Sequence, residues 1–169
     1  MKKLEKEIKY KISYKQEFIE YSPLAAEYLK NITNKIKHNN GGILIIDYAY
    51  TDKKMKNTLQ AVSKHKYCNI LESFGSSDIT HNLSFDLINR MIKEFGFFIS
   101  LTTTQKKFLT ELGIMERAEI VSKNMKFSKK ADIYSRIKRL IDEKQMGHLF
   151  KVMFITDHKN NFKLGFKDA

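Results

Sequence analysis

The feature that most constrains the fold is an unbroken aliphatic segment, Ile43–Ile46, which follows two glycines and precedes Asp47. Successive side chains of a strand point to opposite faces, so this segment presents apolar groups on both sides. The pattern therefore predicts a strand that is buried on both faces. Such a strand is typical of a central, often parallel, position in an α/β sheet.

A helix is expected immediately before this strand. Ser22 can cap a helix N-terminus, and Pro23 suits the first helical position because its missing N–H would have no partner there. Apolar residues then recur at helical spacing, namely Leu24, Tyr28, Leu29, Ile32 and Ile36. The Asn and Gly residues at 39–42 tolerate left-handed backbone and are expected to end the helix.

Strand and helix patterns alternate along the chain, which predicts the α/β class and a single domain over residues 1–169. Period-2 alternation predicts a half-buried strand within residues 8–14. Residues 51–83 are less regular and are expected to form a long loop with a short helix at 59–63. Helices are expected at 85–95, 105–113, 114–125 and 128–141, a buried strand at 97–101, and an antiparallel C-terminal hairpin between 148–157 and 162–166.

The formal net charge of +12 raises the affinity of the chain for any polyanion. The alternative function is therefore a basic binding module for nucleic acid or an acidic partner. Only four of the 31 basic residues are arginine, the side chain suited to bidentate contacts with bases and phosphates. The lysines are also spread along the chain, so nucleic acid is not the expected partner.

Several functional classes are excluded by the sequence. No apolar run approaches the roughly 20 residues of a membrane-spanning helix, and the N-terminus has no apolar signal segment, so a cytoplasmic protein is expected. Cys68 is the only cysteine and the five histidines are scattered, so neither a disulfide nor a metal site is predicted. The Gly-rich signatures of P-loop and dinucleotide-binding proteins are absent.

Asp47 is the first candidate site residue because it lies at the expected carboxyl end of a strand, where ligands of open α/β sheets bind. It could equally anchor a loop by accepting backbone N–H groups. Asp78 and His81 lie three residues apart and form a second polar candidate. Their alternative role is a capping and turn network before the following helix.

Four stretches occur in a distinctive order: EYSPLAAEYLKNIT, GGILIIDYAY, TLQAVSKHKYCNILESFGSSDITHNLSF and MGHLFKVMFI. A fifth, TQKKFLTELGI, lies between the last two. Together they resemble the carboxyl-terminal half of the MidA-like family of S-adenosylmethionine-dependent methyltransferases. The resemblance spans residues 16–157.

Individual residues fit the motifs of this family. Glu20 fits an acidic residue ahead of Ser-Pro, and Asp78 fits an Asp-Ile-Thr motif. Asp47 and Tyr48 fit an Asp-Tyr pair after the glycine-led strand. The chain departs from the family at Ala49, where glycine is usual.

The resemblance implies a partial Rossmann-like methyltransferase sheet with flanking helices. It also implies methylation of a protein arginine, with a subunit of complex I as the type of substrate. Carboxylates would orient the arginine guanidinium, so Asp47 and Asp78 are the candidate catalytic residues. Tyr48, Glu20 and His81 are the candidate substrate-binding residues.

S-adenosylmethionine is the cofactor by resemblance, but the family's Gly-rich cofactor loop lies in an N-terminal half without a counterpart here. This chain alone is therefore expected not to bind the cofactor, and no cofactor-binding residue is assigned. The chain is expected to be an inactive fragment, or to work with a separately encoded N-terminal half.

Overall fold

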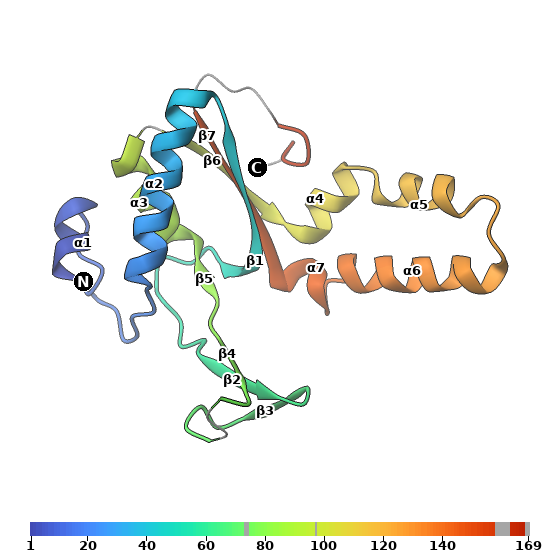
Figure 1. Cartoon of the computed structure of the whole chain (residues 1–169), viewed down its shortest axis with the longest axis horizontal. Coiled ribbons are helices and arrows are strands. Elements are labelled where there is room, and N and C mark those ends of the chain that lie inside the picture. Colours follow the sequence, from blue (N-terminus) through green and yellow to red (C-terminus); the bar gives the residue numbers. More distant parts are fainter. Residues whose placement is uncertain (73–74, 97, 158–162, 168–169) are drawn as a thin grey trace. The chain divides into compact units, whose positions relative to one another are not determined.

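The computed structural model describes residues 1–72, 75–96, 98–157 and 163–167 and divides into two compact units (Figure 1). Unit 1 consists of residues 1–35 and 48–97, and unit 2 of residues 36–47 and 98–169. The single domain expected from the sequence stays a prediction.

The helices and strands alternate along the chain, as the sequence predicts. The helices are α1 (Lys2–Glu7), α2 (Pro23–Asn39), α3 (Phe85–Gly96), α4 (Gln105–Glu111), α5 (Ile114–Ser122), α6 (Phe127–Ile141) and α7 (Met146–Leu149). The strands are β1 (Gly42–Tyr50), β2 (Gln60–Ser63), β3 (Lys66–Cys68), β4 (Asp78–Thr80), β5 (Leu83–Ser84), β6 (Phe98–Thr104) and β7 (Phe150–Asp157).

The larger sheet is mixed and has the strand order β5-β1-β7-β6. The end of β1 pairs in parallel with β5, with Ala49 opposite Leu83 and Tyr50 opposite Ser84. β6 and β7 are antiparallel over their whole length. This mixed sheet with its helices confirms the predicted α/β class.

The strand that pairs in antiparallel fashion with β7 is not the expected one. β7 pairs with β6, which precedes it by almost fifty residues, and not with residues 162–166. Of that segment, residue 162 lies outside the described residues, and the rest belongs to a turn at 163–167. The predicted hairpin partner is therefore wrong for 163–166, because Gly165 takes a left-handed φ of +82° and turns the chain there.

The core of unit 1 is built from α1, α2, α3 and the segments between them. Its buried members are Leu4, Ile8, Ile12, Ala26, Met55, Leu87 and Met91. Two predicted caps hold the helices: Ala25 N–H donates to Ser22 Oγ at 3.2 Å, and Leu87 N–H donates to Ser84 Oγ at 3.3 Å.

The strand expected within residues 8–14 is wrong. Lys9 and Lys15 both take left-handed φ values, 49° and 57°, so the chain turns at each. Ser13 lies between these two turns, and its backbone N–H and hydroxyl both donate to the Glu5 carboxylate of α1. The apolar alternation reflects burial of Ile8 and Ile12 in the core rather than strand pairing.

The apolar side chains of α2 divide between two faces of the helix. Ala26 and Thr33 are buried and Leu29 packs against the core of unit 1. The residues Leu24, Tyr28 and Ile32, spaced four apart, are 59%, 59% and 44% exposed; this row is termed the α2 stripe. A helix covered on both sides would bury these residues too.

β1 also departs from the expectation of burial on both faces. Leu44 and Ile46 are 49% and 43% exposed, whereas their neighbours Ile43 and Ile45 are half-buried. Alternate residues of a strand share a face, so one face of β1 is open in unit 2 as far as its described residues show. Leu44 and Ile46 are termed the β1 face.

The long loop expected over residues 51–83 contains a three-stranded antiparallel sheet, β3-β2-β4. The short helix predicted at 59–63 is wrong, because β2 occupies 60–63. Lys64 and His65 have φ values of 50° and 63°, and two successive left-handed residues form a tight hairpin turn between β2 and β3. Neither residue is a glycine, so the residue types hardly indicate this turn.

Unit 2 packs α4 and α7 near β6 and β7, and its helices α5 and α6 form a hairpin that extends from them (Figure 1). Thr104 Oγ1 caps α4 by accepting from Lys107 N–H, and the buried Gln105 side chain donates to Leu140 O of α6 at 2.9 Å. A Cβ on Gly147 would lie 2.4 Å from Ile141 O, so only glycine allows α7 to approach the end of α6.

Within the described part of the chain, no helix combines the length and apolar character needed to cross a bilayer.

Candidate functional site

A polar network of unit 1 is built around the half-buried carboxylate of Glu20. Its Oε1 accepts hydrogen bonds from the backbone N–H of Thr58 at 2.7 Å and of Leu59 at 2.8 Å. Its Oε2 accepts from the hydroxyl of Thr58. One carboxylate therefore holds the end of residues 51–59, termed the site loop, which follows β1.

A second contact holds the beginning of the site loop. The amide oxygen of Gln16 accepts from Met55 N–H at 2.7 Å, and its nitrogen donates to Lys53 O at 3.1 Å. Gln16 and Glu20 thus bind the site loop from one segment, and the side chain of Met55 is buried in the core.

The network continues into the segment between β4 and β5. The Thr58 hydroxyl oxygen accepts from Asn82 N–H at 2.9 Å, and the Nδ1 atom of His81 lies 3.1 Å from Asn82 O. The structure therefore connects two predicted site residues, Glu20 and His81, through Thr58 and Asn82. Asn82 was not identified from the sequence, because its contribution is a backbone N–H that leaves no signal in the residue type.

The position of Tyr48 relative to this network follows from the strand register. Ala49 of β1 lies opposite Leu83 of β5. Extending that register by one residue sets the backbone of Tyr48 opposite that of Asn82, about 4.8 Å away. Tyr48 is half-buried.

Asp78 and Asp47 occupy other positions. Asp78 is exposed on β4 opposite Val62, and along an extended chain it lies about 10 Å before His81. Asp47 is half-buried on β1 and belongs to unit 2, whereas the Glu20 network belongs to unit 1. Asp47 and Tyr48 are consecutive in a strand, so their side chains point to opposite faces.

Hydrogen bonds shift the pKa of two groups in unit 1. The hydrogen bond from Ser13 N–H lowers the pKa of the Glu5 carboxyl below its usual value. The paired Asp86 carboxylate, 2.7 Å from Arg90 Nε, raises the pKa of the Arg90 guanidinium. Arg90 also lies over the Tyr10 ring at 4.0 Å, so its charge is held in place for structural reasons.

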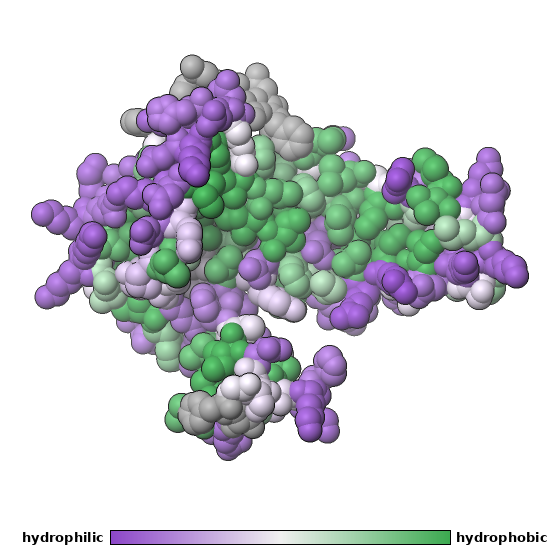
Figure 2. All heavy atoms as spheres, in the orientation of Figure 1, coloured by the Kyte–Doolittle hydropathy of each residue, from purple (hydrophilic) through white to green (hydrophobic). Residues whose placement is uncertain are grey.

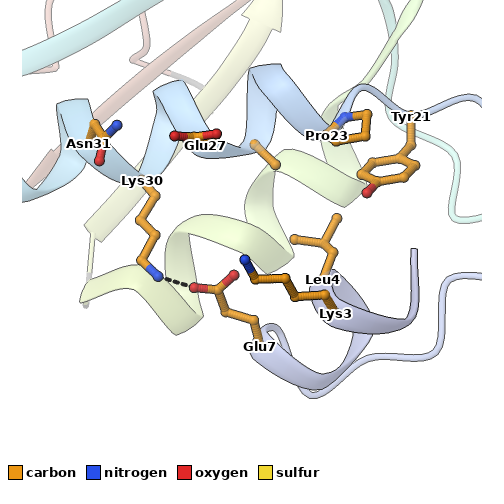
Figure 3. A pocket seen from close by; sticks show the side chains of 9 residues that line it. Lys3, Leu4, Glu7, Tyr21, Pro23, Glu27, Lys30 and Asn31 are labelled. Carbon is orange, nitrogen blue, oxygen red and sulfur yellow. Dashed lines mark hydrogen bonds and ion pairs between the residues drawn. The ribbon is translucent and has the colours of Figure 1, made fainter.

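A cavity of about 430 Å³ lies between α1 and α2 (Figure 3). Figure 3 shows Lys30 of α2 reaching Glu7 of α1, with which it forms an ion pair. A second cavity, of about 290 Å³, is formed by α5, α6 and residue 142 in unit 2. Neither cavity is lined by a predicted site residue.

The residues of these cavities do not fit S-adenosylmethionine. A methionine–adenosine cofactor is expected to need backbone N–H groups of a Gly-rich turn and a nearby carboxylate, and no glycine lines either cavity. Among the described residues, no three His, Cys, Asp or Glu side chains are grouped as metal ligands. The Glu20 network is suited to positioning a loop, because the Thr58 hydroxyl that donates to the carboxylate also accepts from Asn82 N–H.

The comparisons with known proteins agree on one family. The family model described as "Putative S-adenosyl-L-methionine-dependent methyltransferase" matches residues 1–102. A protein arginine methyltransferase NDUFAF7, mitochondrial, from Xenopus tropicalis is 26% identical over 142 residues. The protein of the same name from Homo sapiens is 25% identical over 146 residues.

The chain spans about a third of the length of these relatives. The match covers 83% of this chain and 33% of the Xenopus protein, and 85% of this chain and 32% of the human one.

Two solved structures share the fold. A protein from Burkholderia thailandensis has a TM-score of 0.71 at 20% identity, covering 88% of this chain and 41% of that one. A second structure from that organism, bound to S-adenosyl-homocysteine, has a TM-score of 0.66 at 21% identity, covering 86% and 38%.

The expectation of a cytoplasmic protein is wrong on this evidence. The relatives from Xenopus and human are named as mitochondrial proteins, and this finding overturns the cytoplasmic expectation. The sequence argument relied on the lack of an apolar signal segment, and that lack does not distinguish these two locations.

Proposed function

Because the chain belongs to the family of S-adenosyl-L-methionine-dependent methyltransferases, we propose that it forms the carboxyl-terminal part of such an enzyme. The observation that carries the proposal is the family match over residues 1–102. An N-terminal part, separately encoded or joined to this one in a longer protein, would hold the cofactor, because the two cavities described above do not fit it.

Two exposed apolar surfaces support association with such a part. The α2 stripe consists of three large side chains that are each at least 44% exposed, and the β1 face of two that are at least 43% exposed. Exposed apolar rows on regular elements are typical of interaction surfaces.

The pairing of β1 supports the same proposal. β5 pairs with β1 at only two positions, Ala49 and Tyr50, although β1 begins at Gly42. We propose that a strand from the N-terminal part extends the sheet along residues 42–46 of β1, since an incompletely paired edge accepts further strands. Completing the sheet in this way would also remove an edge that favours aggregation.

The proposed substrate is a protein arginine, and a subunit of complex I is the proposed type. S-adenosylmethionine, when bound by the complete enzyme, would supply the methyl group. The substrate nitrogen must then be held in line with that group, and carboxylates hold a guanidinium well because they accept two parallel hydrogen bonds. We propose Asp47 and Asp78 as separate candidates for this orienting role, and Tyr48 and His81 as separate candidates for contact with the substrate.

Glu20 has a more specific proposed role. Its two carboxylate oxygens already accept three hydrogen bonds from Thr58 and Leu59. We therefore propose that Glu20 acts on substrate binding through the site loop, by fixing the loop at the end of β1, rather than through direct contact.

Methyl transfer by a reconstituted enzyme tests the proposal. The chain is co-expressed with the N-terminal part of the Burkholderia thailandensis relative, and transfer of labelled methyl groups to an arginine-containing protein is measured. Asp47→Asn and Asp78→Asn are each expected to lower kcat by about 10²-fold, because a misplaced substrate loses most of its reactivity. Asp132→Asn is the matched control, since Asp132 is exposed and pairs with Arg136 one turn further along α6.

Turnover unchanged by both Asp47→Asn and Asp78→Asn would remove these residues from the site. A soluble complex of the two parts without any methyl transfer to arginine would contradict the proposed substrate.

A further inference from the structure

The end of the α5–α6 hairpin exposes several large apolar side chains. Residues 120–130, termed the arm tip, connect and flank the two helices at the end distant from α4 (Figure 1). Four of its apolar side chains are exposed, namely Ile120 at 69%, Val121 at 45%, Met125 at 36% and Phe127 at 85%. Phe127 is the most exposed large hydrophobic residue among those the structure describes.

Packing of the two helices does not account for this exposure. α5 buries the small residues Ala118 and Ser122, and α6 begins at Phe127, before its half-buried residues Ile133 and Ile137. The hairpin would therefore form with polar residues at 120 and 127. The fold does not require large apolar side chains at these exposed positions. Their presence there indicates a contact with a partner outside the chain.

The charge of the arm tip is entirely positive. Residues 120–130 include four lysines, Lys123, Lys126, Lys129 and Lys130, and no acidic residue. The nearest carboxylates lie outside the tip, at Glu119 and Asp132, and Asp132 is paired with Arg136. Figure 2 shows hydrophobic atoms bordered by hydrophilic ones at this end of the hairpin.

We propose that the arm tip binds the surface of an anionic phospholipid bilayer, with Phe127 and Ile120 inserted among the headgroups and the lysines facing lipid phosphates. Apolar side chains surrounded by lysine match such a surface, because the membrane interface offers an apolar layer beneath negative charge. This function is independent of methyl transfer.

Two other partners fit the arm tip less well. A second copy of the chain would bring two groups of four lysines together, and like charges repel. Nucleic acid would match the charge, but it offers no apolar layer for Ile120 and Val121, and the tip has no arginine for contacts with bases.

The absence of tryptophan from the sequence allows a direct test with the full chain. Phe127→Trp places a single indole at the tip, and Leu71→Trp, at a residue that is 72% exposed in unit 1, is the control. With vesicles of phosphatidylcholine and phosphatidylglycerol, the emission of Phe127→Trp is expected to shift to the blue and to be quenched by brominated lipid. The Leu71→Trp emission is expected to stay unchanged, as is that of Phe127→Trp with phosphatidylcholine alone.

Charge variants test the electrostatic part. Each lysine near an anionic surface contributes about 1 kcal/mol, so Lys123→Ala with Lys126→Ala is expected to lower the vesicle partition coefficient more than about tenfold. The matched control is Lys66→Ala with Lys107→Ala, which removes the same charge from exposed positions elsewhere. Any of three results overturns the proposal. The first is an equal loss of vesicle partitioning in both double variants. The others are a blue shift of Phe127→Trp emission that higher protein concentration produces without vesicles, and a blue shift caused by an oligonucleotide but not by anionic vesicles.

Discussion

Phe166→Ala is expected to destabilise unit 2 by about 3–5 kcal/mol, the cost of removing a large buried aromatic side chain. Phe166 is 1% exposed, and its ring lies 5.3 Å from that of Phe108 and 6.2 Å from that of Phe154. It joins α4 to β7 in a small core that includes the fully buried Val152. Denaturant unfolding, followed by hydrogen exchange of the β7 amides, measures the loss.

Leu164→Ala is the matched control for this prediction. Leu164 lies two residues away but is 52% exposed, so its truncation is expected to change the free energy of unfolding by less than about 0.5 kcal/mol. If the two variants are equally stable, Phe166 is not part of the core of unit 2.

Glu20→Ala is expected to destabilise unit 1 by about 2–4 kcal/mol, because hydrogen bonds to a charged acceptor are worth more than neutral ones. The variant removes the acceptor for Thr58 N–H, Leu59 N–H and the Thr58 hydroxyl together. Hydrogen exchange at Thr58 and Leu59 is expected to accelerate before that of α3, since the loop loses its anchor first.

Glu17→Ala provides the comparison for Glu20→Ala. Glu17 is 70% exposed and pairs with Lys54, which is 61% exposed, and exposed pairs contribute at most about 1 kcal/mol. Equal protection of Thr58 and Leu59 in the wild-type chain and in Glu20→Ala would show that the carboxylate does not hold the site loop.

The helices could be predicted because their signals are local. Ser22 and Ser84 cap the helices that follow them, and both contacts are made within three residues of the cap. The resemblance to MidA-like methyltransferases was carried by motifs along most of the chain, and the family match and the relatives confirm it.

The elements that the sequence did not predict depend on backbone conformations that the residue types do not favour. Lys9, Lys15, Lys64 and His65 all have left-handed φ values, although glycine and asparagine are the residues that usually take them. The first two replace an expected strand with turns, and the last two form a hairpin in an expected loop.

The contacts of the site could be predicted only in part, because they join residues that are far apart in the sequence. The positions of Asp47 and Tyr48 on a strand follow from the sequence pattern, whereas Glu20 contacts Thr58 across 38 residues. Periodicity and spacing describe neighbours along the chain, so they do not reveal such a contact. The exposed β1 face was likewise expected to be buried, because an apolar pattern shows which residues need cover but not which part of a protein provides it.

The central claim is that this chain carries the carboxyl-terminal part of a methyltransferase and depends on another part for its cofactor. Calorimetric titration of S-adenosylmethionine into the purified chain, alone and in complex with the N-terminal part of the Burkholderia thailandensis relative, tests it most directly. No binding heat with the chain alone and saturable binding with the complex are expected. Micromolar binding by the chain alone would contradict the claim.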